Sequence, residues 1–360
     1  MIKESVNLRS KGYIKSLQSW RAIMIIMIFI LHVCPDKFKL LAGGNETISF
    51  FIILSGFLIS INNYSKNIEC SFRNIVNFVY RKIKKFYPLH LLMLLGCIFL
   101  SLISIVISRN YNEIFTLIVK CVLNIFLIQS FIPSAEYYFS LNGVSWYLSA
   151  TLFFYVISLP MLKKIKQIDK TKLGGILLLL LISHTLIIFI LQDNSNFSYW
   201  TYICPLFRSL EFLSGMLLGV YYLNSKEKID KYITYKKATL LEFTIIVIFL
   251  TQRYLCVYTN IYDMPYNYKS LIAFIISLAI IAIFSIEKGT ISRLLSNRVL
   301  IYIGNISFEI YIMHTVIMNY CDIFLGILGM NKYKVILTLI VTLILAGFIH
   351  SHTIKIRKLD

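Results

Sequence analysis

Long apolar runs alternate with short polar segments along nearly the whole chain. Ten of these runs approach the roughly 20 residues that a helix needs to cross a bilayer, and a further run at about 114–132 is also apolar. The expected crossings lie at about 17–35, 47–62, 87–108, 144–162, 174–191, 199–223, 239–257, 269–286, 298–319 and 333–351. This pattern predicts an all-α fold, a polytopic membrane helical bundle without a sizeable soluble domain.

The basic residues set the expected topology, because Lys and Arg gather in cytoplasmic loops of membrane proteins. The tail at 1–16 is basic and is therefore predicted to be cytoplasmic. If 114–132 crossed fully, the basic loop at 163–172 would lie outside. If 114–132 is re-entrant or does not cross, that loop and all later basic loops lie inside. We therefore predict ten transmembrane helices, one re-entrant or non-crossing segment, and both termini in the cytoplasm.

Composition supports a membrane protein. The chain has 360 residues, of which 58% are hydrophobic and 15% charged, and its mean hydropathy is +0.74. These values lie outside the range of soluble domains. The formal charge of +19 could suggest nucleic acid, but the basic residues form short clusters between apolar runs, so we expect membrane lipids and no nucleic acid as partners. The seven cysteines are scattered without a C-x-x-C and predict free thiols.

These features give the expected organisation of the chain. We predict a cytoplasmic tail at 1–16, a membrane domain at 17–352 and a second cytoplasmic tail at 353–360. The start resembles a signal peptide, but no small-residue cleavage site follows its apolar core, so we expect an uncleaved first span. The predicted location is the cytoplasmic membrane, with multiple passes.

The first apolar run carries two polar side chains that need an explanation. A charged group inside a membrane helix costs roughly 2.5–3.5 kcal/mol even on the most lenient scale. Arg21 and His32 are 11 residues apart, so a helix places them within about 20° on one face and about 16 Å apart along its axis. A snorkelling arginine and a packed histidine remain the simpler interpretation. The shared face favours a polar path instead.

A second feature is the basic segment before the third crossing. Arg81, Lys82, Lys84 and Lys85 precede Pro88, which fits the first turn of a helix. Clustered cations at the inner membrane surface suit anionic lipid. They suit the phosphates of a nucleotide-like cofactor equally well.

Three more pairs of polar residues fall within apolar runs. Arg208 and Glu211 are spaced i, i+3 and are predicted to form a structural ion pair. Glu309 and His314 lie in the run at 298–319, and we expect His314 near its outer end, level with the histidine of the first run.

The third pair lies at the outer end of the run at 144–162. Trp146 and Ser149 belong to the segment S-W-Y-L-S, where the tryptophan is either a membrane anchor or a flat surface for a sugar. No H-x-x-H, H-E-x-x-H or Cys/His cluster predicts a metal site.

Five motifs occur in a familiar order. They are R-(ten residues)-H in the first run, F-F-I-I-L-S-G-F-L-I in the second, R-K-I-K-K-F-Y-P before the third, S-W-Y-L-S, and I-G-N-I-S-F-E-I-Y-I-M-H near the end. Together they resemble the membrane acyltransferase-3 family of O-acyltransferases over about Ser16 to His350. The resemblance implies transfer of an acyl group, commonly acetyl from acetyl-CoA, to a hydroxyl of a cell-surface or lipid-linked glycan.

The resemblance also assigns residues. It links Arg21 and His32 to activity, and the basic motif, here Arg81, Lys84 and Lys85, to the acyl donor. Lys82 lies in the same motif, and Arg81, Lys82, Lys84 and Lys85 together form the expected acetyl-CoA site. Apart from the resemblance, their positions in the apolar runs make Trp146, Ser149, Glu309 and His314 the expected substrate-binding residues.

The chain departs from the family pattern in places. Residues 151–153 read Thr-Leu-Phe where many members have Glu-Glu-Gln. This makes the chain more similar to the branch that acts on poly-N-acetylglucosamine and enterobacterial common antigen. The basic motif has lysine at its second position, which loses bidentate phosphate geometry. We expect no fused esterase-like domain.

The topology suggests a mechanism. A CoA held by its phosphates at the basic motif would send its pantetheine arm through the bundle, past Arg21, over roughly 15–20 Å of helix rise. His32 would be the general base for the sugar hydroxyl. Alternatives stay open: transfer of succinyl to an exopolysaccharide, a transporter or flippase for a lipid-linked sugar, or a non-catalytic export partner. The oligomeric state, including a homodimer, is also open.

Overall fold

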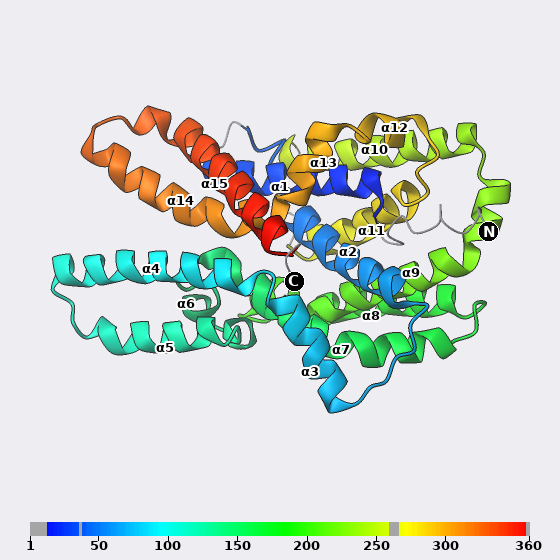
Figure 1. Ribbon diagram of the computed structural model, residues 1–360, viewed down its shortest axis with the longest axis horizontal. Coiled ribbons are helices and arrows are strands. Elements are labelled where there is room, and N and C mark those ends of the chain that lie inside the picture. The colour runs from blue at the N-terminus through cyan, green and yellow to red at the C-terminus, as the bar shows by residue number, and fades with distance from the viewer. Residues whose placement is uncertain (1–12, 36–37, 259–265, 358–360) are drawn as a thin grey trace.

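The computed structural model describes residues 13–35, 38–258 and 266–357, and within them the regular structure is helical (Figure 1). The longer helices are α1 (Lys15–Val33), α2 (Asn45–Asn63), α3 (Phe72–Ile83), α4 (Tyr87–Ser108), α5 (Glu113–Ile125), α7 (Trp146–Gln167), α8 (Leu173–Leu191), α9 (Pro205–Tyr232), α10 (Tyr235–Tyr258), α11 (Tyr266–Phe284), α14 (Ser307–Ile327) and α15 (Lys334–Arg357). Short helices connect them: α6 (Ala135–Tyr138), α12 (Thr290–Leu295) and α13 (Arg298–Asn305).

The predicted fold class is confirmed. Among the described residues, nine helices are long and apolar enough to cross a membrane, and a shorter apolar helix at Lys269–Phe284 supplies a tenth candidate. Helix α5 has 13 residues, or about 20 Å of length, against a hydrocarbon core of about 30 Å. It packs beside α4 and leads into the short α6 (Figure 1), an arrangement that agrees with a segment too short to cross.

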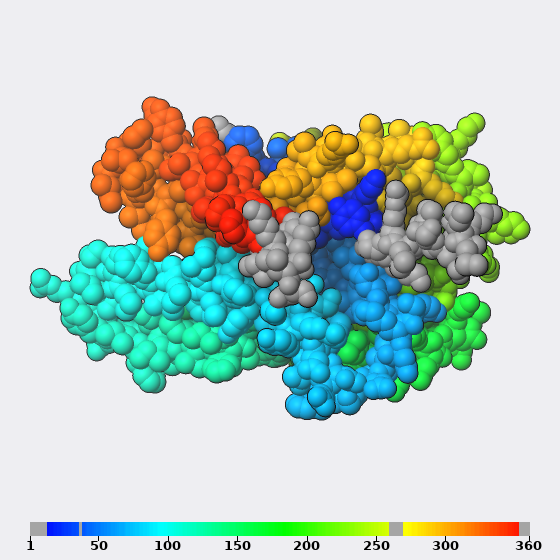
Figure 2. All heavy atoms as spheres, in the orientation of Figure 1, coloured from blue at the N-terminus to red at the C-terminus, as the bar shows by residue number. Residues whose placement is uncertain are grey.

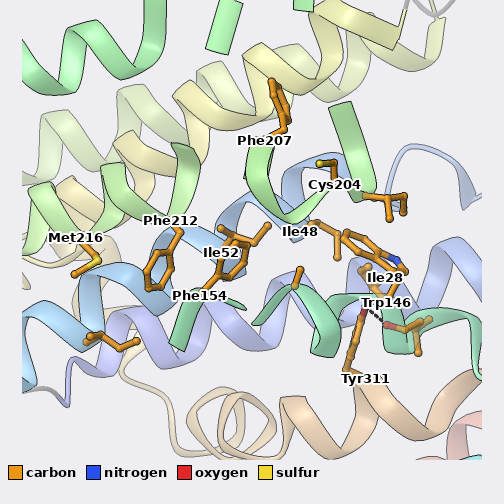
Figure 3. Close-up of a cluster of buried hydrophobic side chains, with 14 of the residues drawn as sticks. Ile28, Ile48, Ile52, Trp146, Phe154, Cys204, Phe207, Phe212, Met216 and Tyr311 are labelled. Atoms are coloured by element: carbon orange, nitrogen blue, oxygen red, sulfur yellow. Dashed lines mark hydrogen bonds between the residues drawn. The ribbon is translucent and has the colours of Figure 1, made fainter. Parts of the chain in front are cut away.

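Helices α2 and α9 pack closely at the centre of the bundle, through glycines. A Cβ at Gly215 would collide with the carbonyl of Ile53, and one at Gly56 with the carbonyl of Phe212. Gly219 follows four residues later and faces Phe57. Such small-xxx-small spacing lets two helix backbones approach closely in a membrane. Phe212 and Met216 of α9 then pack with Phe154 of α7 in the main apolar core (Figure 3).

The predicted bounds of the crossing at 298–319 are wrong, because the helix long enough to cross in this region is α14, Ser307–Ile327. Asn297 caps α13 by accepting a hydrogen bond from the Val299 N–H, α13 ends at Asn305, and α14 runs on to Ile327. The break lies beside Gly304, where a Cβ would collide with the backbone of Gln18 on α1. His314 therefore lies 13 residues before the end of its helix (327 minus 314), not 5.

The basic segment forms an element that the sequence did not predict. Ser71 caps the N-terminus of helix α3 by accepting a hydrogen bond from the Asn74 N–H, and the helix ends next to the start of α4. Its exposed Phe72, Val76 and Tyr80 are spaced four residues apart and form one apolar stripe. On the face of the molecule shown in Figure 2, the start of α4 lies against the end of α15. Pro88 is in the first turn of α4, as predicted.

Candidate active site

Three cavities adjoin one another inside the bundle. The basic cavity, of about 870 Å³, is lined by the four basic residues of the predicted donor motif. The arginine cavity, of about 400 Å³, contains Arg21 and shares Lys82, Lys85 and Glu309 with the basic cavity. The histidine cavity, of about 280 Å³, contains His32 and shares Ile48 and Tyr311 with the arginine cavity. The chain thus brings both ends of its first helix and the basic motif onto one series of cavities.

The basic cavity takes its charge from the junction of α3 and α4. Lys82 lies over the rings of Phe78 and Tyr155, with its Nζ 5.3 and 5.9 Å from their centroids. Burial, together with the neighbouring charges of Lys85, Lys66 and Arg81, lowers the pKa of Lys82 to about 8. An anion at this place would offset the repulsion between Lys82 and the neighbouring cations, because an opposite charge favours the charged form of the lysine.

Arg21 is held by two hydrogen bonds on the wall of the arginine cavity. Its Nη1 donates to Oε1 of Gln18 at 3.0 Å, and its Nη2 donates to Oγ of Ser307 at 2.9 Å. Across the same cavity Nδ1 of His350 lies 2.9 Å from Oε1 of Glu309. His350 is a residue that sequence reasoning missed, since nothing in the spacing along the chain links α15 to α14.

His32 makes direct contact with His314. Nδ1 of His32 lies 2.8 Å from Nε2 of His314, and the two rings stack with centroids 5.1 Å apart. The ring of His314 is fully buried, whereas His32 is exposed at the histidine cavity. The expectation that these two histidines lie at one depth agrees with this contact, although the helix boundaries that first suggested it were wrong.

The rest of the histidine cavity is lined by aliphatic, aromatic and uncharged polar residues, and none of its described lining residues is Asp, Glu, Lys or Arg. Trp146 and Tyr202 form one wall, with ring centroids 5.2 Å apart. Asn142 accepts a hydrogen bond from Oγ1 of Thr315 at 3.1 Å and donates to the carbonyl of Ile312 at 2.9 Å. Asn142, Thr315 and Tyr202 were not predicted. Figure 3 shows Trp146 beside Ile28 and Tyr311.

Not all of the predicted substrate-binding residues reach this cavity. Ser149 is fully buried, and its Oγ lies 2.6 Å from Oγ of Ser130. It lines none of the three cavities, so the structure gives it an interhelical hydrogen bond in place of a substrate contact. Glu309 lines the arginine and basic cavities and not the histidine cavity. Of the four predicted residues, Trp146 lines the histidine cavity directly and His314 contacts its histidine.

Arg208 and Glu211 form a fully buried ion pair, with Nη1 and Oε1 2.6 Å apart. Ser49 donates to the same carboxylate at 3.0 Å, and Nε2 of His184 lies 3.7 Å from it. Nε of Arg208 donates to the Tyr202 carbonyl at 2.8 Å, and its guanidinium lies 5.0 Å from the ring of Tyr202. The ion pair therefore fixes a wall residue of the histidine cavity.

The described part of the chain contains no cluster of side chains that could bind a metal ion. No group of three or more His, Cys, Asp or Glu side chains there is close enough to hold an ion. All seven cysteines are free.

The helical bundle and its internal cavities define a multi-pass membrane protein with polar groups arranged along an apolar core. Residues 14–350 match the Acyl_transf_3 family, which is described as an acyltransferase domain. Because the match covers nearly the whole chain, the chain belongs to this family.

Curated relatives agree with this family. A protein of Staphylococcus aureus strain COL, named a "putative O-acetyltransferase", is 28% identical to the chain over 322 residues. Proteins with the same designation from strains MSSA476 and MRSA252 are 27% identical over the same length. Each alignment covers 86% of the chain and 51% of the relative, so the chain spans about half the length of the curated relatives it matches. No solved structure matches.

Proposed function

We propose that the chain transfers an acetyl group from acetyl-CoA to a hydroxyl of an uncharged sugar in a cell-surface or lipid-linked glycan, with His32 as general base. The observation that carries this proposal is the series of adjoining cavities from the basic motif to His32. Acetyl-CoA is made in the cytoplasm, and a glycan acceptor on the other side of the cytoplasmic membrane would enter from the opposite end.

The donor fits the first two cavities. The phosphates of CoA would pair with Arg81, Lys82 and Lys85 in the basic cavity. The uncharged pantetheine arm would then extend into the arginine cavity, which offers Arg21 and the hydroxyl of Tyr147 as hydrogen-bond donors. Arg21 lies about 16 Å along α1 from His32. Its guanidinium is well placed to hold an amide carbonyl of the arm while the thioester reaches further.

The reaction needs one base and no metal. Nε2 of His32 takes the proton of the sugar hydroxyl as the oxygen attacks the thioester carbonyl. The tetrahedral intermediate collapses, the carbon–sulfur bond breaks, and the CoA sulfur leaves as a thiolate. His32 returns its proton to that sulfur, so the products are the sugar ester and CoA thiol.

The lining of the histidine cavity favours a particular class of acceptor. Among the described residues no Asp, Glu, Lys or Arg lines it, while Asn142, Thr315 and Asn319 offer hydrogen bonds and Trp146 offers an apolar face. Such a lining suits a neutral sugar and leaves the charge of an acidic one without a partner. The same argument favours acetyl over succinyl, whose carboxylate would enter an uncharged cavity.

Labelled acetyl-CoA tests the proposal. Membranes that contain the chain and isolated cell-surface glycan are incubated with acetyl-CoA labelled in the acetyl group, and mild alkali then releases oxygen-bound label. We expect alkali-labile label on the glycan and none with membranes that lack the chain. Label that depends on the chain but resists alkali would mean transfer to nitrogen and not to oxygen. No label while the sugar crosses the membrane would favour a transporter instead.

The low pKa of Lys82 predicts pH-dependent donor binding. Without a bound anion Lys82 is mostly charged at pH 7 and mostly neutral at pH 9, so its contact with a phosphate is stronger at pH 7 than at pH 9. A hydrogen bond between charged groups is worth about 1.5–3 kcal/mol, so affinity for a non-reactive acetyl-CoA analogue should fall about tenfold between these two pH values. Calorimetric titration of the purified chain measures it.

Lys82→Arg is the matched control, because its guanidinium stays charged throughout this range. The variant should bind with nearly equal affinity at both pH values. A wild-type affinity that is flat with pH, or an equal fall in Lys82→Arg, would remove Lys82 from the donor site.

A further inference from the structure

Hydrogen bonds around the paired histidines fix where their protons lie. Nδ1 of His314 is 2.7 Å from the carbonyl oxygen of Tyr311 and 3.1 Å from that of Ile310. A carbonyl oxygen only accepts, so Nδ1 of His314 carries the proton. In a neutral imidazole the other nitrogen is then an acceptor. Nε2 of His314 therefore presents a lone pair.

The same reasoning passes to His32. Its Nδ1 lies 2.8 Å from that lone pair, and two lone pairs facing each other at this distance would repel. Nδ1 of His32 is accordingly the donor, and Nε2 of neutral His32 is left unprotonated. Within the described part of the chain this Nε2 has no hydrogen-bond partner, and the His32 side chain lines the histidine cavity.

We infer that His314 is a positioning residue for His32: it holds the ring in the tautomer whose Nε2 is free to accept a proton in the cavity. This inference rests on the proposed role of His32 as base. It replaces the substrate-binding role expected for His314 from the sequence. His314 is fully buried, and its contact with the cavity runs through His32.

The surroundings of His314 suit this role. Its backbone acceptors belong to its own helix α14, three and four residues earlier, so the ring cannot turn over without losing both contacts. Tyr311, which supplies one of these carbonyls, is itself fixed by donating its hydroxyl to the Val144 carbonyl at 2.8 Å. When His32 is protonated it keeps its Nδ1–H donor to His314, and the carbonyls behind His314 face the positive charge. The pair thus works in both states of the base.

Substitutions separate this role from packing. His314→Phe keeps a planar ring but removes the acceptor, whereas the side-chain oxygen of His314→Gln can still accept from Nδ1 of His32. Loss of the correct tautomer is costly where it has been measured, up to about 10⁴-fold in kcat. We expect kcat for glycan O-acetylation to fall at least about a hundredfold in His314→Phe with little change in KM for acetyl-CoA, and His314→Gln to recover most of it. His352→Phe, at an exposed histidine of α15, is the control and should keep full activity.

A spectroscopic measurement tests the same inference without the glycan substrate. The chain has six histidines, and ¹⁵N labelling of their rings distinguishes protonated from unprotonated nitrogens. The difference between wild-type and His32→Ala spectra at neutral pH identifies the His32 signals, which we expect to show Nδ1 protonated and Nε2 unprotonated. In His314→Phe the ring of His32 should no longer show the tautomer with Nδ1 protonated as its single form. His314→Gln should retain it.

The outcomes separate the two proposals. Full activity in His32→Ala would overturn the proposed base. Inactive His32→Ala together with fully active His314→Phe would leave the base in place and overturn the role of His314. Wild-type His32 protonated at Nε2, or equal losses in His314→Phe and His314→Gln with an unchanged tautomer of His32, would also overturn it, since packing alone would then account for the effect.

Discussion

Replacing His32 with alanine should reduce glycan O-acetylation between about 10²- and 10⁴-fold, the range that a positioned general base contributes. The reason is geometric: His32 supplies an imidazole to the cavity at the far end of the series, and within the described residues its Nε2 has no hydrogen-bond partner. The measurement is the initial rate of label transfer from acetyl-CoA to purified glycan in membranes with equal amounts of each variant.

Two controls make this loss specific to the base. The His32→Ala chain should bind an acetyl-CoA analogue as tightly as the wild type. Arg21 is already about 16 Å from His32 along α1, and the basic motif lines a different cavity from His32. His90→Ala changes another buried histidine, whose Nε2 contacts the Asn124 carbonyl at 3.0 Å outside the three cavities, and should keep most of the activity. Transfer by His32→Ala at a normal rate would require a different base.

The helix period explains why part of the site was predictable. Arg21 and His32 lie on one helix, so their spacing alone placed them on one face, and the structure puts both on adjoining cavities. Charge clustering likewise predicted the basic motif, because four cations within five residues of one another must share a surface whatever the fold. These inferences needed local geometry only.

Contacts between distant helices were not available in the same way. Gln18 and Ser307 bind Arg21, and Ser307 comes from a helix almost 300 residues later. His350 was passed over because its partner Glu309 lies on α14. Ser149 was assigned to the substrate from its place beside Trp146, but successive residues of a helix point in different directions, and this serine faces Ser130 instead.

Helix ends were the other source of error. The run at 298–319 is apolar enough on average to be taken as one span, although Gly304 and Asn305 interrupt it, and average hydropathy alone gave no sign of the break at Ile306. The break follows from a close approach between Gly304 and the backbone of Gln18, which depends on the packing of α13 against α1. Hydropathy measures the preference of a segment for lipid, and tertiary packing decides where its helix starts.

Neutralising Glu211 should destabilise the chain strongly. Glu211→Gln leaves the Arg208 guanidinium, which is fully buried, without its counter-charge at 2.6 Å. Breaking a buried pair by removing one partner costs about 3–5 kcal/mol, and we expect a large fall in the thermal unfolding temperature of the purified chain. Activity should fall as well, because Arg208 also holds the Tyr202 carbonyl in the wall of the histidine cavity.

An exposed ion pair gives the matched comparison. Lys334 and Asp322 are 2.8 Å apart, with side chains 28% and 51% exposed, and exposed pairs contribute about 0–1 kcal/mol. Asp322→Asn removes one charge as Glu211→Gln does and should hardly move the unfolding temperature.

The double variant Arg208→Met/Glu211→Met removes both buried charges and should recover much of the stability lost in Glu211→Gln. It should not recover the activity, because the contact from Arg208 to Tyr202 is still absent. Equal shifts for Glu211→Gln and Asp322→Asn would mean that the Arg208–Glu211 pair is not buried as described. Full activity in the double variant would mean that the Arg208–Glu211 pair does not hold the wall of the histidine cavity in its active shape.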